Sequence, residues 1–540
     1  MNSNILKQSL QGLLLFILLG FVLLFYSGKI VFINADLGRH IKNGEVISQT
    51  FKPFQTNFYS LTEKDYPVIN HHWGSGVLFY YIYRGFGFKG ISFFYAVVSV
   101  LTFLIFFIVT KKLSNFSLAY FFSLLFLPLI TNRVEIRPEG LSYFFLAVFL
   151  SLLIYHKLNV IRFRWLCALP LIQILWVNTH IFFIFGPLFI LIFGMDAFIH
   201  QRDRSLTRKY VFLFLADMMC CLVNPAGLEG ALIPLTIFKE YGYMLAENQP
   251  VIFMQKRFPE NHIYPYFEIC FAVLVAGLAG CIRRNNWSKF IIPVCIIAGV
   301  SLLAWRAVRI LALFGYLAMP FAANSWHIIT EKGKRYAQAI QRGLLVTGIC
   351  IIAFGLTSKN KIVSPYYNLH NGYVKIQKHS GWWLKDVVMN YWSMPGLLPQ
   401  AQDSAEFFLR LNTEGPVFNN YDIGSYLIFY LFPKYRVFVD NRPEAYSSAF
   451  FKSIYIPMQE KETVWQEALA RYQFNVIYFY RLDMTPWAQT FLIERVKDPV
   501  WAPIYVDDFS IIFLRRNDAN DPAIRRFELS KEIFSIQPTH

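Results

Sequence analysis

Charged residues are scarce in this chain. Of its 540 residues only 16% are Asp, Glu, Lys or Arg, whereas 55% are hydrophobic and 18% are aromatic. Soluble domains carry nearer a quarter of charged residues, so this composition excludes an ordinary soluble protein. From residue 9 to residue 356, apolar runs of roughly 17–22 residues recur, which is the length that crosses a bilayer as a helix. We therefore predict an integral membrane protein.

Cysteine is also rare, and it is confined to the apolar runs. All seven cysteines lie in these runs, none belongs to a CxxC pattern, and none follows residue 350. This distribution excludes a disulfide framework and gives no support to a cysteine metal site. The apolar run at 13–26 lacks the small-residue cleavage site of a signal peptide, and we interpret it as a retained first helix.

Acidic residues are outnumbered by basic ones, 34 against 51. The imbalance belongs to the apolar part, because residues from 358 onward hold 20 basic and 19 acidic side chains. Basic residues at the ends of membrane helices indicate topology, so we exclude nucleic acid as a partner. Residues 1–357 are predicted to form the transmembrane domain, with a first outer loop at 29–90, and residues 358–540 a soluble α/β domain.

The apolar runs predict eleven membrane-spanning helices, at 9–28, 91–110, 116–130, 139–156, 163–178, 181–199, 208–224, 263–281, 288–304, 307–326 and 341–357. If the N-terminus is cytoplasmic, every short connection on the cytoplasmic side is basic, as the positive-inside rule requires. An odd number of spans then places the C-terminal domain outside the cytoplasm. The predicted fold class is a polytopic α-helical membrane protein with about 11 transmembrane helices and a C-terminal extracytoplasmic α/β domain.

The soluble domain alternates short apolar runs with amphipathic ones. Its strands are predicted at 417–419, 427–431, 435–439, 476–480 and 509–514, and its helices include 403–411 and 460–472. Polar clusters follow two of the strands, at 420–424 and 439–444. Binding groups often lie in such loops, although turn chemistry and a structural Asp–Arg pair explain these clusters equally well.

Asp36 and His40 follow the first span, at the start of a short amphipathic stretch. In a helix they would lie one turn apart on the same face. A carboxylate at the membrane surface can deprotonate a hydroxyl or hold a metal ion. The alternative, which spacing alone favours slightly, is a helix N-cap followed by a solvated histidine.

His71 and His72 lie later in the same loop, between Asn70 and Trp73. Adjacent histidines can ligate a divalent metal, but no second carboxylate stands at ligand spacing. Packing, or hydrogen bonds to a substrate, is the favoured interpretation, and we predict no metal site or cofactor.

Four arginines are predicted on the side that the positive-inside rule disfavours: Arg133, Arg137, Arg306 and Arg309. A guanidinium suits a phosphate, and a set of them facing a membrane cavity suits a lipid phosphate. The alternative is snorkelling, or pairing with Glu135 and Glu139. For the set as a whole we favour the anion site. Asn178 and His180, in the connection between the fifth and sixth spans, are further candidates for substrate binding.

These motifs resemble the GT-C superfamily of membrane glycosyltransferases, and more closely a group of bacterial GT-C-like membrane proteins. That group has an Asp, a His four residues later, a Gly, and then Asn-His-x-Trp, which match Asp36, His40, Gly44 and Asn70–Trp73 here. Further pieces of the same pattern are Arg137-Pro138-Glu139, Trp176-x-Asn178-x-His180, Asn224-Pro225 and Val439-Asp440-x-Arg442. The resemblance extends over most of the chain.

The resemblance implies a glycosyltransferase, a hexosyl- or pentosyltransferase, that moves a sugar from a polyprenyl phosphate to a lipid, glycan or protein acceptor. Asp36 would be the catalytic carboxylate, and Glu135 is the nearest match to the second acidic residue of many relatives. No sequence like the WWDYG-type signature of oligosaccharyltransferases is present, which argues against transfer of a preassembled glycan to asparagine. The implied location is a bacterial inner membrane, with the C-terminal domain in the periplasm.

Two other functional classes stay open. One is a transporter or flippase of a lipid-linked sugar or polyanion, which would use the same arginines without making or breaking bonds. Transporters usually place polar groups near the membrane midplane and often contain repeats, and no repeat is visible here. The other is a non-catalytic GT-C-like scaffold for envelope assembly.

Overall fold

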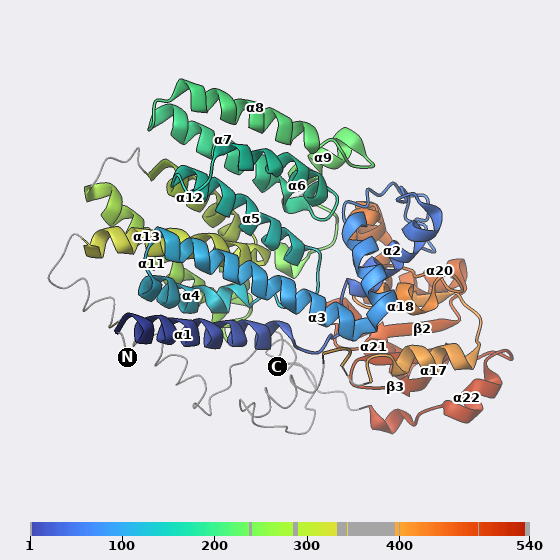
Figure 1. Cartoon of the computed structure of the whole chain (residues 1–540). Helices are drawn as coiled ribbons and strands as arrows, with labels where there is room; N and C mark the ends of the chain where they lie inside the picture. Colours follow the sequence, from blue (N-terminus) through green and yellow to red (C-terminus); the bar gives the residue numbers. More distant parts are fainter. Residues whose placement is uncertain are drawn as a thin grey trace.

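The structure is a computed structural model that describes residues 3–236, 240–284, 290–331, 343, 395–398, 400–483 and 485–534. A bundle of long helices is joined end-on to a smaller domain that contains a β-sheet (Figure 1). The predicted eleventh span at 341–357 and the predicted domain boundary after residue 357 lie outside the described residues.

Each of the first ten predicted spans coincides with a helical segment. The helices are α1 (Ser3–Tyr26), α3 (Trp73–Leu113), α4 (Phe116–Ile130), α5 (Glu139–Lys157), α6 (Leu169–Val177), α7 (Phe185–Ile199), α8 (Arg204–Cys220), α11 (Ile263–Arg284), α12 (Ile291–Arg306) and α13 (Leu311–Glu331). Short 3-10 turns precede α6, α7 and α13, at Phe163–Ala168, Ile181–Ile184 and Val308–Ile310. Two further short helices, α9 (Gly227–Thr236) and α10 (Val251–Arg257), connect α8 to α11.

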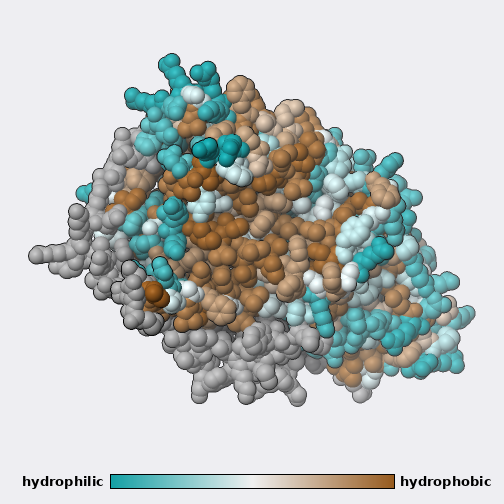
Figure 2. All heavy atoms as spheres, viewed as in Figure 1, coloured by the Kyte–Doolittle hydropathy of each residue, from teal (hydrophilic) through white to brown (hydrophobic). Residues whose placement is uncertain are grey.

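The helical bundle belongs in a membrane. Six helices of the described part, in α1, α3, α5, α7, α11 and α13, are long and apolar enough to cross one, and α4, α6 and α12 are shorter apolar helices. Figure 2 shows a broad hydrophobic face over the helices, bordered by hydrophilic residues over the sheet domain and at the opposite end. The chain is therefore a multi-pass membrane protein, and the number of eleven crossings remains a prediction.

Helix α13 forms the centre of the bundle, where it packs against α3, α4, α11 and α12. Its residues from Leu311 to Ala323 are almost completely buried, which explains why this helix is apolar on every face. Gly315 allows α4 to approach closely, because a Cβ there would lie 2.9 Å from Ile130 Cγ1. The position of Arg309, directly before α13, is therefore fixed by the most buried helix of the protein.

The C-terminal domain contains a four-stranded sheet in the order β1-β2-β4-β3, with strands β1 (Val417–Asn419), β2 (Val476–Tyr480), β3 (Trp501–Val506) and β4 (Ser510–Arg515). β1 and β2 are parallel, and the other neighbours are antiparallel. The helices are α17 (Asp403–Leu411), α18 (Gly424–Leu431), α19 (Pro457–Glu460), α20 (Glu462–Tyr472), α21 (Pro486–Lys497) and α22 (Asp521–Phe527), and a π-helical turn spans Phe450–Tyr455.

Two of the predicted strands are wrong. Residues 427–431 belong to helix α18, because a short apolar run does not distinguish a buried strand from a buried helix. Residues 435–439 form only an isolated bridge, between Val437 and Ser60 of the first outer loop. Strand β3 was not predicted, since Pro503 disfavours a strand, and the pairing of β3 with β4 is irregular next to this proline.

The first outer loop contains helix α2 (Leu37–Thr50), which packs between α3 and α18 (Figure 1). Gly44 lies directly against Gly76 of α3, because a Cβ at residue 44 would lie 2.0 Å from the Gly76 carbonyl oxygen. Gly38 similarly lies against α18, since its Cβ would lie 2.8 Å from the Ser425 carbonyl oxygen. Two glycines therefore hold the first turns of α2 between the membrane helices and the sheet domain.

Candidate active site between the helical bundle and the C-terminal domain

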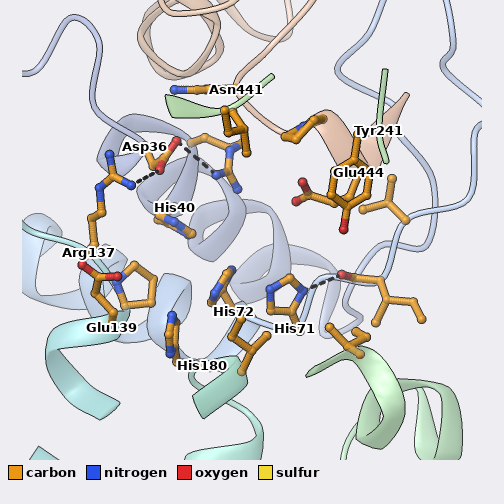
Figure 3. A pocket seen from close by; sticks show the side chains of 18 of the residues that line it. Asp36, His40, His71, His72, Arg137, Glu139, His180, Tyr241, Asn441 and Glu444 are labelled. Carbon is orange, nitrogen blue, oxygen red and sulfur yellow. Dashed lines mark hydrogen bonds and ion pairs between the residues drawn. The ribbon is translucent and has the colours of Figure 1, made fainter. Parts of the chain in front are cut away.

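A cavity of about 290 Å³ lies where α2, the membrane helices and the C-terminal domain meet (Figure 3). Seven separate parts of the chain supply its polar lining: α2 and the residue before it, the segment before α3, the α4–α5 connection with the start of α5, the α6–α7 connection, the segment after α9, the turn before α13, and the loop after residue 440. The charged and imidazole side chains in this lining are Asp36, Arg39, His40, His71, His72, Arg137, Glu139, His180, Glu247, Arg309 and Glu444.

Asp36 lies at the N-terminus of α2 with its carboxylate between two guanidiniums. Its Oδ1 is 3.5 Å from Arg39 Nη2 and its Oδ2 is 3.4 Å from Arg137 Nη1. The Asp36 side chain makes no capping hydrogen bond to α2, and His40 is only 2% exposed. Asp36 does occupy the N-cap position, but it caps no backbone N–H and the histidine is not solvated, so the carboxylate is available to the cavity.

Each arginine of the α4–α5 connection has an acidic partner close in sequence. Arg133 binds Glu139 through two nitrogens, at 2.7 and 3.1 Å, and Arg137 Nε lies 2.6 Å from Glu135. The pairing with Glu135 and Glu139 that the sequence offered as an alternative is thus present. Both arginines also contact Glu247, a third acidic side chain.

Glu247 is the point where three guanidiniums converge. Its Oε2 is 2.8 Å from Arg133 Nη1 and 3.1 Å from Arg137 Nη1, and its Oε1 is 3.5 Å from Arg309 Nη1. Burial alone would raise the pKa of this carboxyl, but the three guanidiniums outweigh burial and hold the pKa well below its ordinary value. Glu247 is therefore an anion in this site.

Four imidazoles form a cluster beside Asp36. The ring centroid of His72 is 3.9 Å from that of His71, 5.3 Å from that of His40 and 5.2 Å from that of His180. Burial is the largest cause that lowers the pKa of each histidine, and neighbouring arginines and imidazoles lower it further. All four rings are therefore neutral at pH 7, and each offers one N–H donor and one acceptor nitrogen.

Hydrogen bonds assign the tautomer of two of these rings. The Phe182 N–H donates to His180 Nδ1 at 3.3 Å, which makes Nδ1 an acceptor. The Ser142 hydroxyl, which accepts from Trp176 Nε1 at 2.7 Å, therefore donates to Nδ1 at 2.9 Å. His180 therefore carries its proton on Nε2 and can donate it into the cavity. His71 Nδ1 lies 3.2 Å from the Ile69 carbonyl oxygen, which requires a proton on Nδ1 and leaves Nε2 as an acceptor.

Four of the predicted binding residues lie outside the lining of the cavity. Arg133 and Glu135 lie behind Arg137 and hold the arginine cluster, as described above. Asn178 accepts a hydrogen bond from Trp73 Nε1 at 2.8 Å and donates to the Ile174 and Val223 carbonyls, which gives it a structural position. Arg306 is exposed at the end of α12.

Sequence reasoning did not propose Arg39, Glu139, Tyr241, Glu247, Asn441 or Glu444 as site residues. Arg39 lies inside the Asp36 motif, and Asn441 and Glu444 belong to the polar cluster at 439–444, so these had a signal. Glu247 had none, because it lies in a short 3-10 turn (Ala246–Asn248) of a long connection. Only the fold brings it to the arginines.

The part of the chain that the structure describes contains no group of three His, Cys, Asp or Glu side chains arranged to hold a metal ion. The rings of His71 and His72 are tilted by 48° to each other, and Nδ1 of His71 is already used for a bond to the Ile69 carbonyl. The absence of a metal or cofactor requirement remains a prediction.

We expect the protein to lose stability as the pH falls from about 6.5 towards 4. The unfolded chain takes up protons on these imidazoles near pH 6.5, whereas burial keeps the pKa of His71 at about 4 and those of its neighbours well below 6.5. The unfolded state then binds more protons in this window, so unfolding becomes more favourable. Thermal unfolding between about pH 4 and pH 7 measures this slope.

His72→Asn should flatten that slope, and the same substitution at His262, which is exposed, serves as the control. An unchanged slope in His72→Asn would mean that this ring is not part of the titrating cluster.

No protein-family model matches this chain, and no curated protein matches its sequence. Solved structures do match. The archaeal oligosaccharyltransferase AglB from Archaeoglobus fulgidus, in complex with an inhibitory peptide and a dolichol-phosphate, superposes with a TM-score of 0.56 at 10% identity, over 92% of this chain and 73% of that chain.

A second structure is the Archaeoglobus fulgidus oligosaccharyltransferase tethered to an acceptor peptide with an NVT sequon. It gives a TM-score of 0.55 at 11% identity, over 95% of this chain and 74% of the other. At such identity the likeness establishes the fold alone. This chain therefore has the fold of these two oligosaccharyltransferase structures, in agreement with the resemblance that its motifs carry.

Proposed function

We propose that this protein is a membrane glycosyltransferase that moves one sugar from a polyprenyl phosphate to an acceptor hydroxyl. The observation that supports this most directly is the cavity that holds Asp36 together with Arg137 and Arg309. A carboxylate for the acceptor and guanidiniums for a phosphate are the two groups that the reaction needs, and they come from distant parts of the chain.

Asp36 is assigned as the general base. The acceptor hydroxyl gives its proton to the Asp36 carboxylate while its oxygen bonds to the anomeric carbon. The bond from that carbon to the phosphate oxygen breaks, and the electron pair leaves with the polyprenyl phosphate. Arg39 and Arg137 hold Asp36 in place from either side, at 3.5 and 3.4 Å. The attack inverts the configuration at the anomeric carbon.

Stabilisation of the negative charge on the leaving phosphate is assigned to the arginines. Arg137 and Arg309 line the cavity, and guanidiniums aimed at a developing phosphate charge lower the barrier to its departure. Arg137 Nη1 contacts both Asp36 and Glu247, so the proposed base and the proposed phosphate site share this guanidinium. Arg306, which is exposed and outside the lining, has no part in this mechanism.

The histidines are assigned to the sugar. His180 offers an N–H donor and His71 an acceptor nitrogen, so together they can bind hydroxyl groups that both donate and accept. The volume of about 290 Å³ is at the lower end of small-molecule sites. This size supports a hexose or pentose as the transferred group, in agreement with the missing WWDYG-type sequence.

One similar structure contains a dolichol-phosphate, which supports a lipid-linked donor, and the other contains an acceptor peptide, which supports a protein or peptide acceptor. For this chain we propose a polyprenyl-phosphate sugar as donor, and a lipid, glycan or protein as acceptor. We place the protein in a bacterial inner membrane, with a cytoplasmic N-terminus and a periplasmic C-terminal domain. The basic short connections support this orientation.

A transporter is less well supported. Its functional polar groups would lie near the middle of the membrane. Here the polar lining includes Asn441 and Glu444 of the C-terminal domain, which lies at one end of the bundle (Figure 1). The test is turnover by purified protein in lipid vesicles supplied with polyprenyl-phosphate sugars. Failure with every lipid-linked sugar tried would favour a transporter or a scaffold.

Arg309→Met should raise the donor KM by about 10- to 100-fold, because a hydrogen bond to a charged group contributes about 1.5–3 kcal/mol. The kcat should change less, since Arg137 remains. Arg257→Met is the matched control, because Arg257 is an exposed arginine at the end of α10. A donor KM that stays at the wild-type value in Arg309→Met would remove Arg309 from the phosphate site.

A further inference from the structure

Glu247 has an unusual position for a loop carboxylate. It lies in the turn Ala246–Asn248, yet it contacts guanidiniums from two distant segments, the α4–α5 connection and the residues before α13. Its side chain keeps 25% of its surface exposed, whereas that of Glu139 keeps 3%. Both acids line the cavity, and Glu247 is the more exposed of the two acidic partners of Arg133.

The arginines do not need Glu247 for their own placement. Arg133 is held by both carboxylate oxygens of Glu139, and Arg137 by Glu135. Both of these acids belong to the same connection as the arginines. Arg309 has a second contact, to Asn248 Oδ1 at 3.1 Å, and its Nε is buried without a hydrogen-bond partner. Glu247 is therefore an additional anion on a cluster that is already assembled.

The contacts of Glu247 are those that a phosphate would make. Two oxygens, bound by nitrogens of three guanidiniums at 2.8, 3.1 and 3.5 Å, form the kind of charge-assisted site that arginines offer to carboxylates and phosphates alike. Arg137 Nη1 lies 3.1 Å from Glu247 and 3.4 Å from Asp36. An anion that replaced Glu247 would consequently lie beside the proposed base.

The segment that carries Glu247 is attached at both ends. Toward the C-terminal domain, the ring of Tyr243 stacks on that of Tyr421 with centroids 4.2 Å apart, and Glu240 pairs with Lys452. Toward the bundle, the Gln249 carbonyl accepts a hydrogen bond from Val308 N at 3.1 Å. Release of Glu247 from the arginines would therefore require movement of its turn alone, while the contacts at both ends stay in place.

We propose that the Glu247 carboxylate occupies the binding site of the donor's phosphate when no donor is bound, and that the phosphate of the polyprenyl donor displaces it. This inference rests on the proposed function and adds to it the position of the phosphate and an internal competitor for that position. The guanidinium of Arg309, whose ion pair in the described part of the chain is with Glu247, then always has an anion beside it, which avoids an uncompensated buried cation. The apparent donor affinity is lowered by the fraction of molecules in which Glu247 is bound.

Glu247→Gln tests the proposal because it keeps the shape of the side chain and removes its charge. We expect farnesyl phosphate, a short polyprenyl phosphate, to bind the purified protein at least about tenfold more tightly in this variant. Glu247→Asp keeps the charge on a shorter side chain and should lie between the two. Glu260→Gln, at an exposed acid after α10, is the control and should bind as the wild type does.

The outcomes separate the two proposals. Equal or weaker binding in Glu247→Gln, with clear binding in the wild type, would overturn the competitor and leave the proposed function standing. Absence of binding in the wild type and in both Glu247 variants would count against the phosphate site itself. If Glu247→Gln yields too little protein for titration, the increase in unfolding temperature caused by farnesyl phosphate is compared between wild type and Glu247→Asp. A larger increase in the variant supports displacement, and an equal one overturns it.

Discussion

Replacement of Asp36 by asparagine should lower the rate of sugar transfer by about 10²- to 10⁴-fold, the range that a general base contributes. The amide has the shape of the carboxylate but cannot take the proton of the acceptor hydroxyl. The two contacts to Arg39 and Arg137 lose their ionic character, yet the packing of α2 rests on Gly38 and Gly44 and should persist. The measurement is turnover of a polyprenyl-phosphate sugar by purified protein in vesicles.

Asp65→Asn is the matched control for this prediction, because Asp65 is an exposed acid of the same loop. Binding of farnesyl phosphate, measured alongside, distinguishes a lost base from a damaged site. If Asp36→Asn binds the phosphate and still turns over at the wild-type rate, the base is another group. The neutral imidazole of His71, whose Nε2 accepts, would then be the next candidate.

Local sequence patterns predicted the elements of this protein better than its contacts. The apolar runs of the membrane domain coincide with helices because burial in lipid demands a long uninterrupted apolar segment. In the C-terminal domain, β1 and α17 agree with their predicted bounds. Leu427–Leu431 was assigned to a strand because five apolar residues fit either structure, and contact with α2 decides for the helix.

The site was predictable where its residues share a short motif. Asp36 and His40 lie on one turn of α2, so their proximity follows from helix geometry, and their motif also includes Arg39. That Arg137 joins them could be proposed only from the topology, since 101 positions separate it from Asp36. The contact of Glu247 with three arginines depends on the packing of a turn that has no pattern of its own, and no sequence argument reaches it.

The arginines show how two interpretations can both hold. Pairing of Arg137 with Glu135 and of Arg133 with Glu139 was the alternative to anion binding, and the structure contains both pairs. The convergence of the same arginines on Glu247 adds a third anion to the cluster. The local ion pairs therefore fix the guanidiniums in position. The ability to bind an external anion depends on how many guanidiniums lie close together.

A buried ion pair joins the first outer loop to the C-terminal domain. Arg442 donates to both oxygens of Asp440 at 2.7 Å and to Asn57 Oδ1 at 2.6 Å, and Asn57 Nδ2 donates to the Ala445 carbonyl at 2.8 Å. Arg442 is 3% exposed and Asp440 is completely buried. The guanidinium also lies over the ring of Tyr59, 5.6 Å from its centroid. This network holds the loop that carries Asp36 against the domain that contributes Glu444.

Arg442→Met should therefore destabilise the protein by about 3–5 kcal/mol, because it leaves the Asp440 carboxylate buried without its cation. Unfolding of the purified protein in detergent, followed by tryptophan fluorescence, measures the loss. Arg525→Met is the control, since Arg525 and its partner Asp521 are exposed and such pairs contribute at most about 1 kcal/mol.

The double variant Asp440→Asn/Arg442→Met distinguishes a charge effect from a packing effect. If the unpaired carboxylate causes most of the loss of stability, the double variant should be more stable than Arg442→Met alone, because it removes the buried charge that the single variant leaves without a partner. Transfer activity should recover with it, since the loop and the domain again enclose the cavity. A double variant that is less stable than the single one would show that Arg442 acts through its contacts with Asn57 and Tyr59, and that the ion pair is not what joins the two parts of the site.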